Sequence, residues 1–206
     1  MGIEEDLPLL YRTPPEWAAV ALASPLLLLN DHAHLEKKAA GNALDMLARW
    51  PEPSPPENWV HSMTSIASDE IAHLQLVTKI LSRRGGRLTK AHQNPYAAEL
   101  RSHVRRGGGT EETLDRLLVS ALIEARSCER FRLLGDHCPD EELARLYEGL
   151  YRSEAGHYRV FLALARALPD RPAVDARWEE FLRLEKEIIQ RQPPGPTMHS
   201  GPAITH

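Results

Sequence analysis

Apolar residues recur every three to four positions along most of the chain, and prolines and glycines divide this pattern into separate stretches. This spacing places the apolar side chains on one face of a helix, so each stretch predicts an amphipathic helix with one buried side. Helices with one buried side pack into bundles. The sequence therefore predicts an all-α protein with four long helices, over about residues 26–49, 57–84, 110–138 and 141–168.

Shorter elements are expected at both ends and between the second and third long helices. The segment Thr13–Pro15 predicts the start of a short N-terminal helix, since proline is tolerated in a first helical turn. The connection over residues 85–109 includes a short helix over residues 96–106. A connection of this length suits a crossover that packs the second helical hairpin against the first. A final amphipathic helix is expected over residues 174–191.

The length and composition indicate one domain. A chain of 206 residues with 42% hydrophobic residues can bury a single core. We expect this domain to occupy residues 14–192. Residues 1–13 are expected to form a loosely ordered lead-in, and residues 193–206 a flexible tail rich in proline and glycine.

No membrane span and no disulfide are expected. The longest apolar stretch, residues 18–29, is interrupted by proline and falls short of the ~20 residues that cross a bilayer. The two cysteines, Cys128 and Cys138, fall on one predicted helix about 15 Å apart, which is too far for a bond between them. A reducing cytoplasm is the natural location for such a chain.

Two copies of a Glu-x-x-His motif lie midway along the second and fourth predicted long helices. Glu70 precedes His73, and Glu154 precedes His157. A carboxylate and an imidazole three residues apart project from one helix face, with Cβ atoms about 5–6 Å apart, which suits joint ligation of a metal ion. The motif is common by chance, so it indicates a metal site only if other ligands lie at the same height along the helices.

One glutamate on each preceding helix is expected at the height of the motif. Glu36 and Glu70 lie equally far in sequence from the turn that joins the first two long helices. At about 1.5 Å per residue, both lie roughly 20 Å from that turn. Glu124 and Glu154 lie almost equally far from the turn between the last two long helices. Glu129 misses this level by roughly 7 Å, so Glu124 is the better candidate.

Four helices would thus bring four carboxylates and two imidazoles to one level of the bundle. Such a set is the known pattern of di-iron and di-manganese carboxylate bundles. Two divalent ions would neutralise four carboxylates, whereas each carboxylate buried without metal would cost several kcal/mol or take up a proton. Carboxylate-rich ligation favours iron over zinc and leaves manganese open. The candidate metal ligands are Glu36, Glu70, His73, Glu124, Glu154 and His157.

Two alternatives apply to these polar residues. The glutamates could line solvated helix faces with the histidines at the edge of the core, which leaves two matched registers unexplained. His32, one turn before Glu36, is expected to be a structural histidine, with a supporting role beside a metal ligand as its alternative.

The chain also resembles the tRNA 2-methylthio-isopentenyl-adenosine hydroxylase family, whose members are MiaE-like proteins of the ferritin-like di-iron superfamily. The resemblance covers about residues 12–192 and is carried by four stretches. These are LLNDHAHLEKKAAGN at 28–42, DEIAH at 69–73, IEARSCERF at 123–131 and SEAGHY at 153–158. It implies a ferritin-like four-helix bundle with a long crossover between helices two and three and extra helices at both ends.

The resemblance further implies an O₂-dependent monooxygenase that hydroxylates the isopentenyl side chain of a modified adenosine next to the tRNA anticodon. The six candidate ligands would hold two iron ions. The reaction would need O₂ as co-substrate and electrons from an external donor, an unidentified reductase. The anticodon loop is single-stranded, so its bases are accessible without melting a duplex.

A basic segment is the candidate contact for the tRNA. The net charge of −4 gives no global attraction to nucleic acid, but residues 79–106 contain eight Lys or Arg and one acid. A solvated loop kept soluble by its charge is the alternative. Within the resemblance, this segment would contact phosphates. The candidate substrate-binding residues are Arg83, Arg84, Arg105 and Arg106.

Two other function classes share parts of this pattern. A ferritin-like or rubrerythrin-like ferroxidase or peroxide-scavenging protein would use the same bundle and ligands. The chain has no Cys-x-x-Cys pair for a rubredoxin-type module, and iron storage does not require a long basic crossover. A metal-free helical RNA-binding or scaffold protein is the third class, which metal analysis would distinguish.

Overall fold

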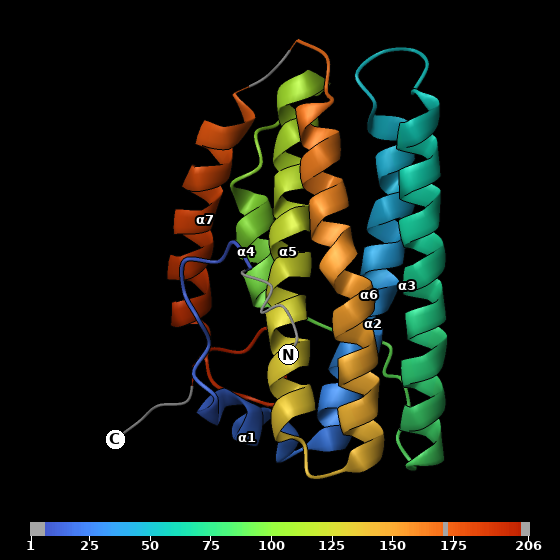
Figure 1. Cartoon of the computed structure of the whole chain (residues 1–206), viewed down its shortest axis with the longest axis vertical. Coiled ribbons are helices and arrows are strands. Elements are labelled where there is room, and N and C mark those ends of the chain that lie inside the picture. The colour runs from blue at the N-terminus through green and yellow to red at the C-terminus, as the bar shows by residue number, and fades with distance from the viewer. Residues whose placement is uncertain (1–6, 171–172, 203–206) are drawn as a thin grey trace, which may run out of the picture.

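Four long helices form a bundle in the computed structural model, which describes residues 7–170 and 173–202. Figure 1 shows that α3 ends at the end of the bundle opposite to the start of α5, so these two helices run in the same direction. Over the described residues the chain contains helices and no strand, which confirms the all-α prediction. The long helices are α2 (Pro25–Met46), α3 (Glu57–Arg83), α5 (Gly109–His137) and α6 (Glu141–Arg166).

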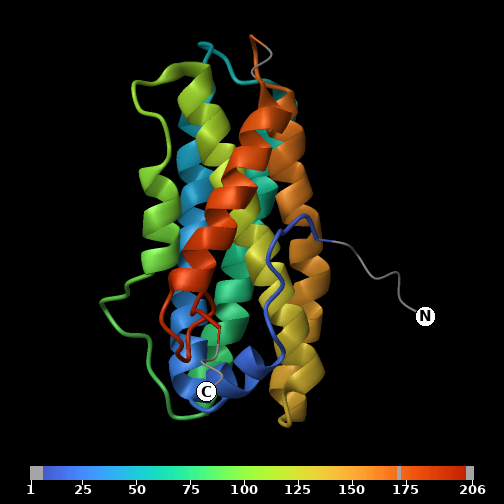
Figure 2. The same cartoon turned by 90° about the vertical axis from the view of Figure 1, so that its left-hand side faces the viewer.

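Shorter helices cover one side of the bundle. The crossover from α3 to α5 has to travel the length of the bundle, and α4 lies within it beside α5 and α7 (Figure 2). The short helix predicted over residues 96–106 is thus confirmed, although it begins one residue earlier and ends four residues earlier. The shorter elements are α1 (Glu16–Leu22), the 3-10 helix η1 (Leu47–Arg49), α4 (Pro95–Ser102) and α7 (Val174–Arg191).

The start of α5 depends on three consecutive glycines. Gly107, Gly108 and Gly109 have φ angles of +126°, +79° and +76°, a region that side chains with a Cβ atom rarely adopt. The Glu112 carboxylate accepts hydrogen bonds from the Gly107 and Gly108 amides at 3.2 and 2.8 Å. The sequence predicted a cap from Thr110, but the helix begins at Gly109 and Glu112 binds the free amides instead.

Two apolar clusters lie along the bundle axis, one on each side of a polar layer. The first surrounds Trp59 and Phe161, and the second surrounds Trp17 and Tyr147, all with fully or almost fully buried side chains. The helix positions between the two clusters carry the predicted metal ligands. The two apolar clusters therefore fix the position of the predicted ligands along the bundle axis.

Both chain ends pack more tightly than the sequence suggested. In the described part of the lead-in, residues 7–13, Leu7 and Leu9 are buried, and Thr13 donates from its amide and hydroxyl groups to Glu129. The expectation of a loose lead-in is wrong for these residues. Residues 1–6 lie outside the described structure.

The expectation of a flexible tail is likewise wrong for residues 193–202. Met198, His199 and Ser200 are at most 5% exposed. The Ser200 hydroxyl accepts from the Trp17 indole at 2.8 Å, and its carbonyl accepts from Arg130 at 3.0 Å. Proline and glycine here form a compact coil held by specific polar contacts. Residues 203–206 of the predicted tail lie outside the described structure.

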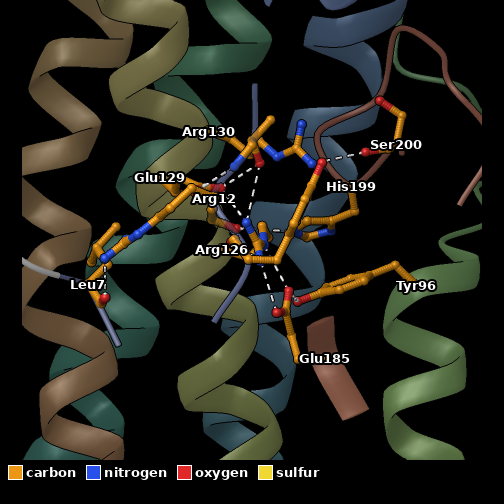
Figure 3. A network of polar contacts seen from close by, with 12 residues as sticks. Leu7, Arg12, Tyr96, Arg126, Glu129, Arg130, Glu185, His199 and Ser200 are labelled. Atoms are coloured by element: carbon orange, nitrogen blue, oxygen red, sulfur yellow. Dashed lines mark hydrogen bonds and ion pairs between the residues drawn. The ribbon is translucent and has the colours of Figure 1, made fainter. Parts of the chain in front are cut away.

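A buried ion network joins these outer segments to α5 (Figure 3). Arg126 on α5 donates two hydrogen bonds to Glu185 on α7, at 2.8 and 2.9 Å, and also pairs with Glu129. The Tyr96 hydroxyl of α4 donates to the same Glu185 at 3.0 Å. This network holds α4 and α7 against α5 and explains why Glu129 stays outside the metal-ligand layer.

Neither a disulfide nor a membrane span occurs in the described structure. Cys128 is buried within α5, while Cys138 lies at its C-terminal end, and both are free thiols. Among the helices of residues 7–170 and 173–202, none combines the length and the apolar character that crossing a bilayer requires.

Candidate metal centre

The six predicted ligands meet between the four long helices. Their side chains form two overlapping groups of four, and within each group one donor atom from every residue lies within 4.8 Å of the others. Glu70 and Glu154 belong to both groups. Glu36 and His73 complete the first group, and Glu124 and His157 complete the second. The expected common level is therefore observed, while metal ligation by these residues stays a prediction.

The donor atoms face one another at distances suited to a shared cation. The Nδ1 atom of His73 lies 2.8 Å from a Glu154 oxygen and 3.6 Å from a Glu36 oxygen. The Nδ1 atom of His157 lies 2.9 Å from Glu70 and 2.8 Å from Glu154.

Three of these buried donor atoms have no hydrogen bond of acceptable geometry despite their close neighbours. They are Glu70 Oε1, His73 Nδ1 and Glu154 Oε1. A buried polar atom without a partner is costly, and a metal ion would satisfy all three. The residues present therefore fit a pair of divalent ions.

The charges of the six side chains also fit two cations. Burial raises the pKa of Glu36 and of Glu124, and burial together with Glu154 raises that of Glu70 to about 7. Burial opposes protonation of the two histidines, but the carboxylates close to their ring nitrogens raise the pKa of His73 to about 12 and that of His157 to about 11. Without metal, protons supply the positive charge that this layer needs.

The residue before each motif glutamate supports the histidine of the other motif. Ser153, which precedes Glu154, lies 3.0 Å from His73 Nε2, and Asp69, which precedes Glu70, lies 3.4 Å from His157 Nε2. Contacts to the distal ring nitrogen fix the orientation of a ligating imidazole. Sequence reasoning missed both residues, although a polar residue at the same place in both motifs was a signal for them.

His32 contacts a predicted ligand directly. Its Nε2 atom lies 2.5 Å from a Glu36 oxygen, and its ring packs against Phe131 and Tyr147. Burial lowers the pKa of His32 to about 4, so the ring is neutral where it contacts Glu36. This contact favours the alternative of a supporting role for His32.

A cavity of about 480 Å³ opens onto the metal-ligand layer between α2, α4 and α5. Four ligand carboxylates, those of Glu36, Glu70, Glu124 and Glu154, lie at its inner end. Its volume is in the range of pockets that bind small molecules. The apolar lining residues are Leu35, Ala39, Ala97, Val104, Val119, Ile123 and Phe131.

Comparison with known proteins assigns the chain to a family. Residues 4–200 match the family model described as tRNA-(MS2IO6A)-hydroxylase (MiaE). The chain belongs to the MiaE family. A relative from Pseudomonas putida, named tRNA 2-(methylsulfanyl)-N(6)-isopentenyladenosine(37) hydroxylase, is 40% identical over 190 residues, which cover 92% of this chain and 90% of the relative.

Two further relatives agree with this family and with the fold. A Salmonella typhimurium protein of the same name is 34% identical over 145 residues, which cover 69% of this chain and 52% of that relative. A solved structure, titled a protein with aldehyde deformylating oxygenase activity from Synechococcus, has a TM-score of 0.85 and 33% identity, and the match covers 96% of this chain and 98% of that one. The predicted ferritin-like bundle is thus confirmed.

The four arginines predicted to bind substrate are not brought together. Arg83 pairs with Glu142, and Arg84 binds Asp140 at 2.7 and 2.8 Å, both at the end of the bundle where α5 turns into α6. These positions lie about 20 Å along α3 from Glu70.

The other two predicted arginines lie on the crossover side of the bundle. Arg105 donates to the buried Asp115 at 2.8 and 3.0 Å. Of the four predicted arginines, Arg106 lines the cavity. Contact of any of them with tRNA stays a prediction.

Replacing Ser153 with alanine is expected to weaken metal binding by about tenfold, because losing a partner of a ligating imidazole costs about 10–100-fold in affinity. The readout is Fe(II) or Co(II) titration of the metal-free protein. Threonine at this position keeps the hydroxyl and should retain most of the affinity. Equal affinities for the alanine variant and the wild type would show that this contact does not support a ligand.

Proposed function

We propose that this MiaE-family chain hydroxylates the isopentenyl side chain of 2-methylthio-isopentenyl-adenosine beside the tRNA anticodon, using two iron ions and O₂. The observation that carries the proposal is the position of four of the six clustered side chains, the carboxylates, at the inner end of a cavity that apolar residues help to line. The Pseudomonas putida and Salmonella typhimurium relatives carry names for this reaction. A cytoplasmic location follows from a tRNA substrate.

The chain itself contributes binding, orientation and exclusion of water. Glu70 and Glu154 belong to both ligand groups and would help to hold both ions, while His73 and His157 are oriented by Ser153 and Asp69. Leu35, Val119 and other apolar residues line the path to the ligands and suit a prenyl group. Such walls would aim the hydrocarbon at the metal pair and keep bulk water away from it.

When bound, the two irons would supply the reduction of O₂. The overall reaction takes one C–H bond, O₂, two electrons and two protons to one C–OH group and one water. The given sequence has no Cys-x-x-Cys pair for a rubredoxin-type centre that could supply these electrons. We therefore propose an external reductase as a partner.

The proposal is tested with iron-reconstituted, reduced protein and tRNA that carries the prenylated nucleoside. After exposure to ¹⁸O₂ and digestion, mass spectrometry is expected to find one ¹⁸O atom in the prenyl side chain. An unchanged nucleoside, with about two irons per chain verified, would contradict the proposal.

Two other activities serve as comparisons in the same experiment. The Synechococcus structure carries an aldehyde deformylating activity in its title, so a long-chain aldehyde is included as a second substrate. Aldehyde turnover without tRNA hydroxylation would replace the proposed function. Ferroxidase or peroxide-scavenging activity is not favoured by the relatives' names, and rapid iron or peroxide turnover without tRNA hydroxylation would restore that alternative.

A further inference from the structure

Four basic side chains line the cavity away from its metal-ligand end. Lys38 comes from α2, Arg101 from the end of α4, Arg106 from the following loop and Arg116 from α5. Lys38 is distant from the other three in sequence, and the fold brings all four to one cavity. We call these four residues the basic rim.

The basic rim is poorly neutralised by the protein's own acids. Arg116 binds the Glu112 carboxylate at 2.7 and 2.8 Å, and that carboxylate is also held by two glycine amides. Among the described residues, no carboxylate forms an ion pair with Arg101, Arg106 or Lys38. Lys38 donates instead to the Nδ1 atom of His92, at 2.8 Å.

The basic residues also act on one another. Although Arg101 is exposed, partial desolvation by the surrounding protein, followed by the charge of Arg116, lowers its pKa. The charge of Arg101 likewise repels that of Lys38. Three of the four rim cations have no acid partner among the described residues, so the rim has a positive potential that attracts an anion.

The spacing along α5 orders the cavity from its metal end to its basic rim. Glu124, Ser120, Arg116 and Glu112 follow one another at intervals of four residues and all line the cavity. Residues four apart lie on one helix face, so this face carries a metal ligand, then a hydroxyl, then a cation. Arg116 lies roughly 12 Å along the axis from Glu124. This separation is comparable with the reach from the end of a prenyl group on a purine to the phosphate of the same nucleotide.

We propose that the basic rim, with Arg101 as its central residue, binds the phosphate groups that flank the target nucleotide and so sets how deep its prenyl tail enters. The proposal rests on the proposed function and deepens it. It assigns the tRNA contact to residues around the cavity. Arg83 and Arg84, which lie near the start of the basic segment, are then not part of the contact. These two arginines lie on the other side of the ligand layer, because α3 and α5 run in the same direction.

Arg101→Gln tests the proposal, with Arg145→Gln as a matched control. Arg145 is an exposed arginine on α6 whose substitution makes the same change in net charge. Binding of prenylated tRNA is measured as Kd against salt concentration. Arg101→Gln is expected to raise Kd roughly tenfold and to reduce the slope of log Kd against log salt by about 0.7–1. Arg145→Gln should match the wild type, and Arg101→Lys should restore part of the affinity.

A second substrate separates this proposal from the proposed function. The free prenylated nucleoside has no phosphate, so Arg101→Gln should lower kcat/KM for tRNA by a much larger factor than that for the nucleoside. On tRNA, Arg101→Gln should raise KM with little change in kcat. Equal Kd and salt slope in wild type and Arg101→Gln would overturn the role of the rim even if tRNA is hydroxylated.

Two further results would also count against the rim. An equal loss of affinity in Arg145→Gln would show a general charge effect. An equal loss of kcat/KM for the nucleoside and for tRNA in Arg101→Gln would show a structural effect at the cavity. By contrast, absence of hydroxylation by the wild type on every substrate would contradict the proposed function, whereas a changed salt slope for Arg101→Gln would still support the rim.

Discussion

Replacing Glu154 with alanine is expected to remove both metal ions, whereas replacing Glu36 is expected to remove one. Glu154 belongs to both groups of four donor atoms, while Glu36 belongs to one of them. Removing a residue that binds the metal directly should lower the metal affinity more than removing a residue that only orients a ligand, which costs about 10–100-fold. After anaerobic reconstitution with Fe(II), we expect about two irons per chain in the wild type, about one in Glu36→Ala and almost none in Glu154→Ala.

The control for this experiment is Glu148→Ala, which removes an exposed glutamate from the same helix. Circular dichroism of the metal-free proteins establishes that the helices are retained. Glu154→Gln provides a second check, because it keeps the volume of the side chain while removing its charge. Two tightly bound irons in Glu154→Ala, or equal iron contents in Glu36→Ala and Glu154→Ala, would refute a shared role of Glu154 in holding both ions.

The height of the ligands could be predicted because a helix has a fixed rise per residue. Counting from each turn placed Glu36 level with Glu70 and Glu124 level with Glu154, and the structure brings these residues together. The same counting excluded Glu129, which pairs with Arg126 and binds Thr13 instead. Regular secondary structure thus carried information about tertiary position.

The partners of charged side chains could not be predicted in this way. The basic segment was identified by counting its cations, but the acids that neutralise them come from elsewhere. Asp140 and Glu142, which pair with Arg84 and Arg83, lie at the start of α6, far from α3 in sequence. A charge count along the sequence cannot contain such contacts, because they depend on which helices become neighbours.

The chain ends escaped prediction for a related reason. The tail near Met198 has no helical periodicity, so its composition suggested disorder, yet Met198 is fully buried. Its order comes from single contacts such as the Met198 amide to Asp31 at 2.8 Å and Arg130 to the Ser200 carbonyl. Isolated contacts of this kind leave no repeating signal in a sequence.

Replacing Arg126 with methionine is expected to destabilise the protein by about 3–5 kcal/mol, because it leaves buried carboxylates without their cation. Arg126 and Glu185 are both 0% exposed. After the substitution, Glu185 would keep the Tyr96 hydroxyl as its partner, and Glu129 would keep Thr13. Urea unfolding of the metal-free protein measures the change in the free energy of unfolding.

The double variant Arg126→Met with Glu185→Met separates the cost of an unpaired charge from the value of the ion pair. Replacing both partners by apolar side chains of similar length removes the unpaired carboxylate, so the double variant should be more stable than Arg126→Met alone. Arg145→Met, at an exposed ion pair, should change stability by less than about 1 kcal/mol. If the double variant loses as much stability as the sum of the two single variants, the two side chains act independently and the network does not hold α7 against α5 through this pair.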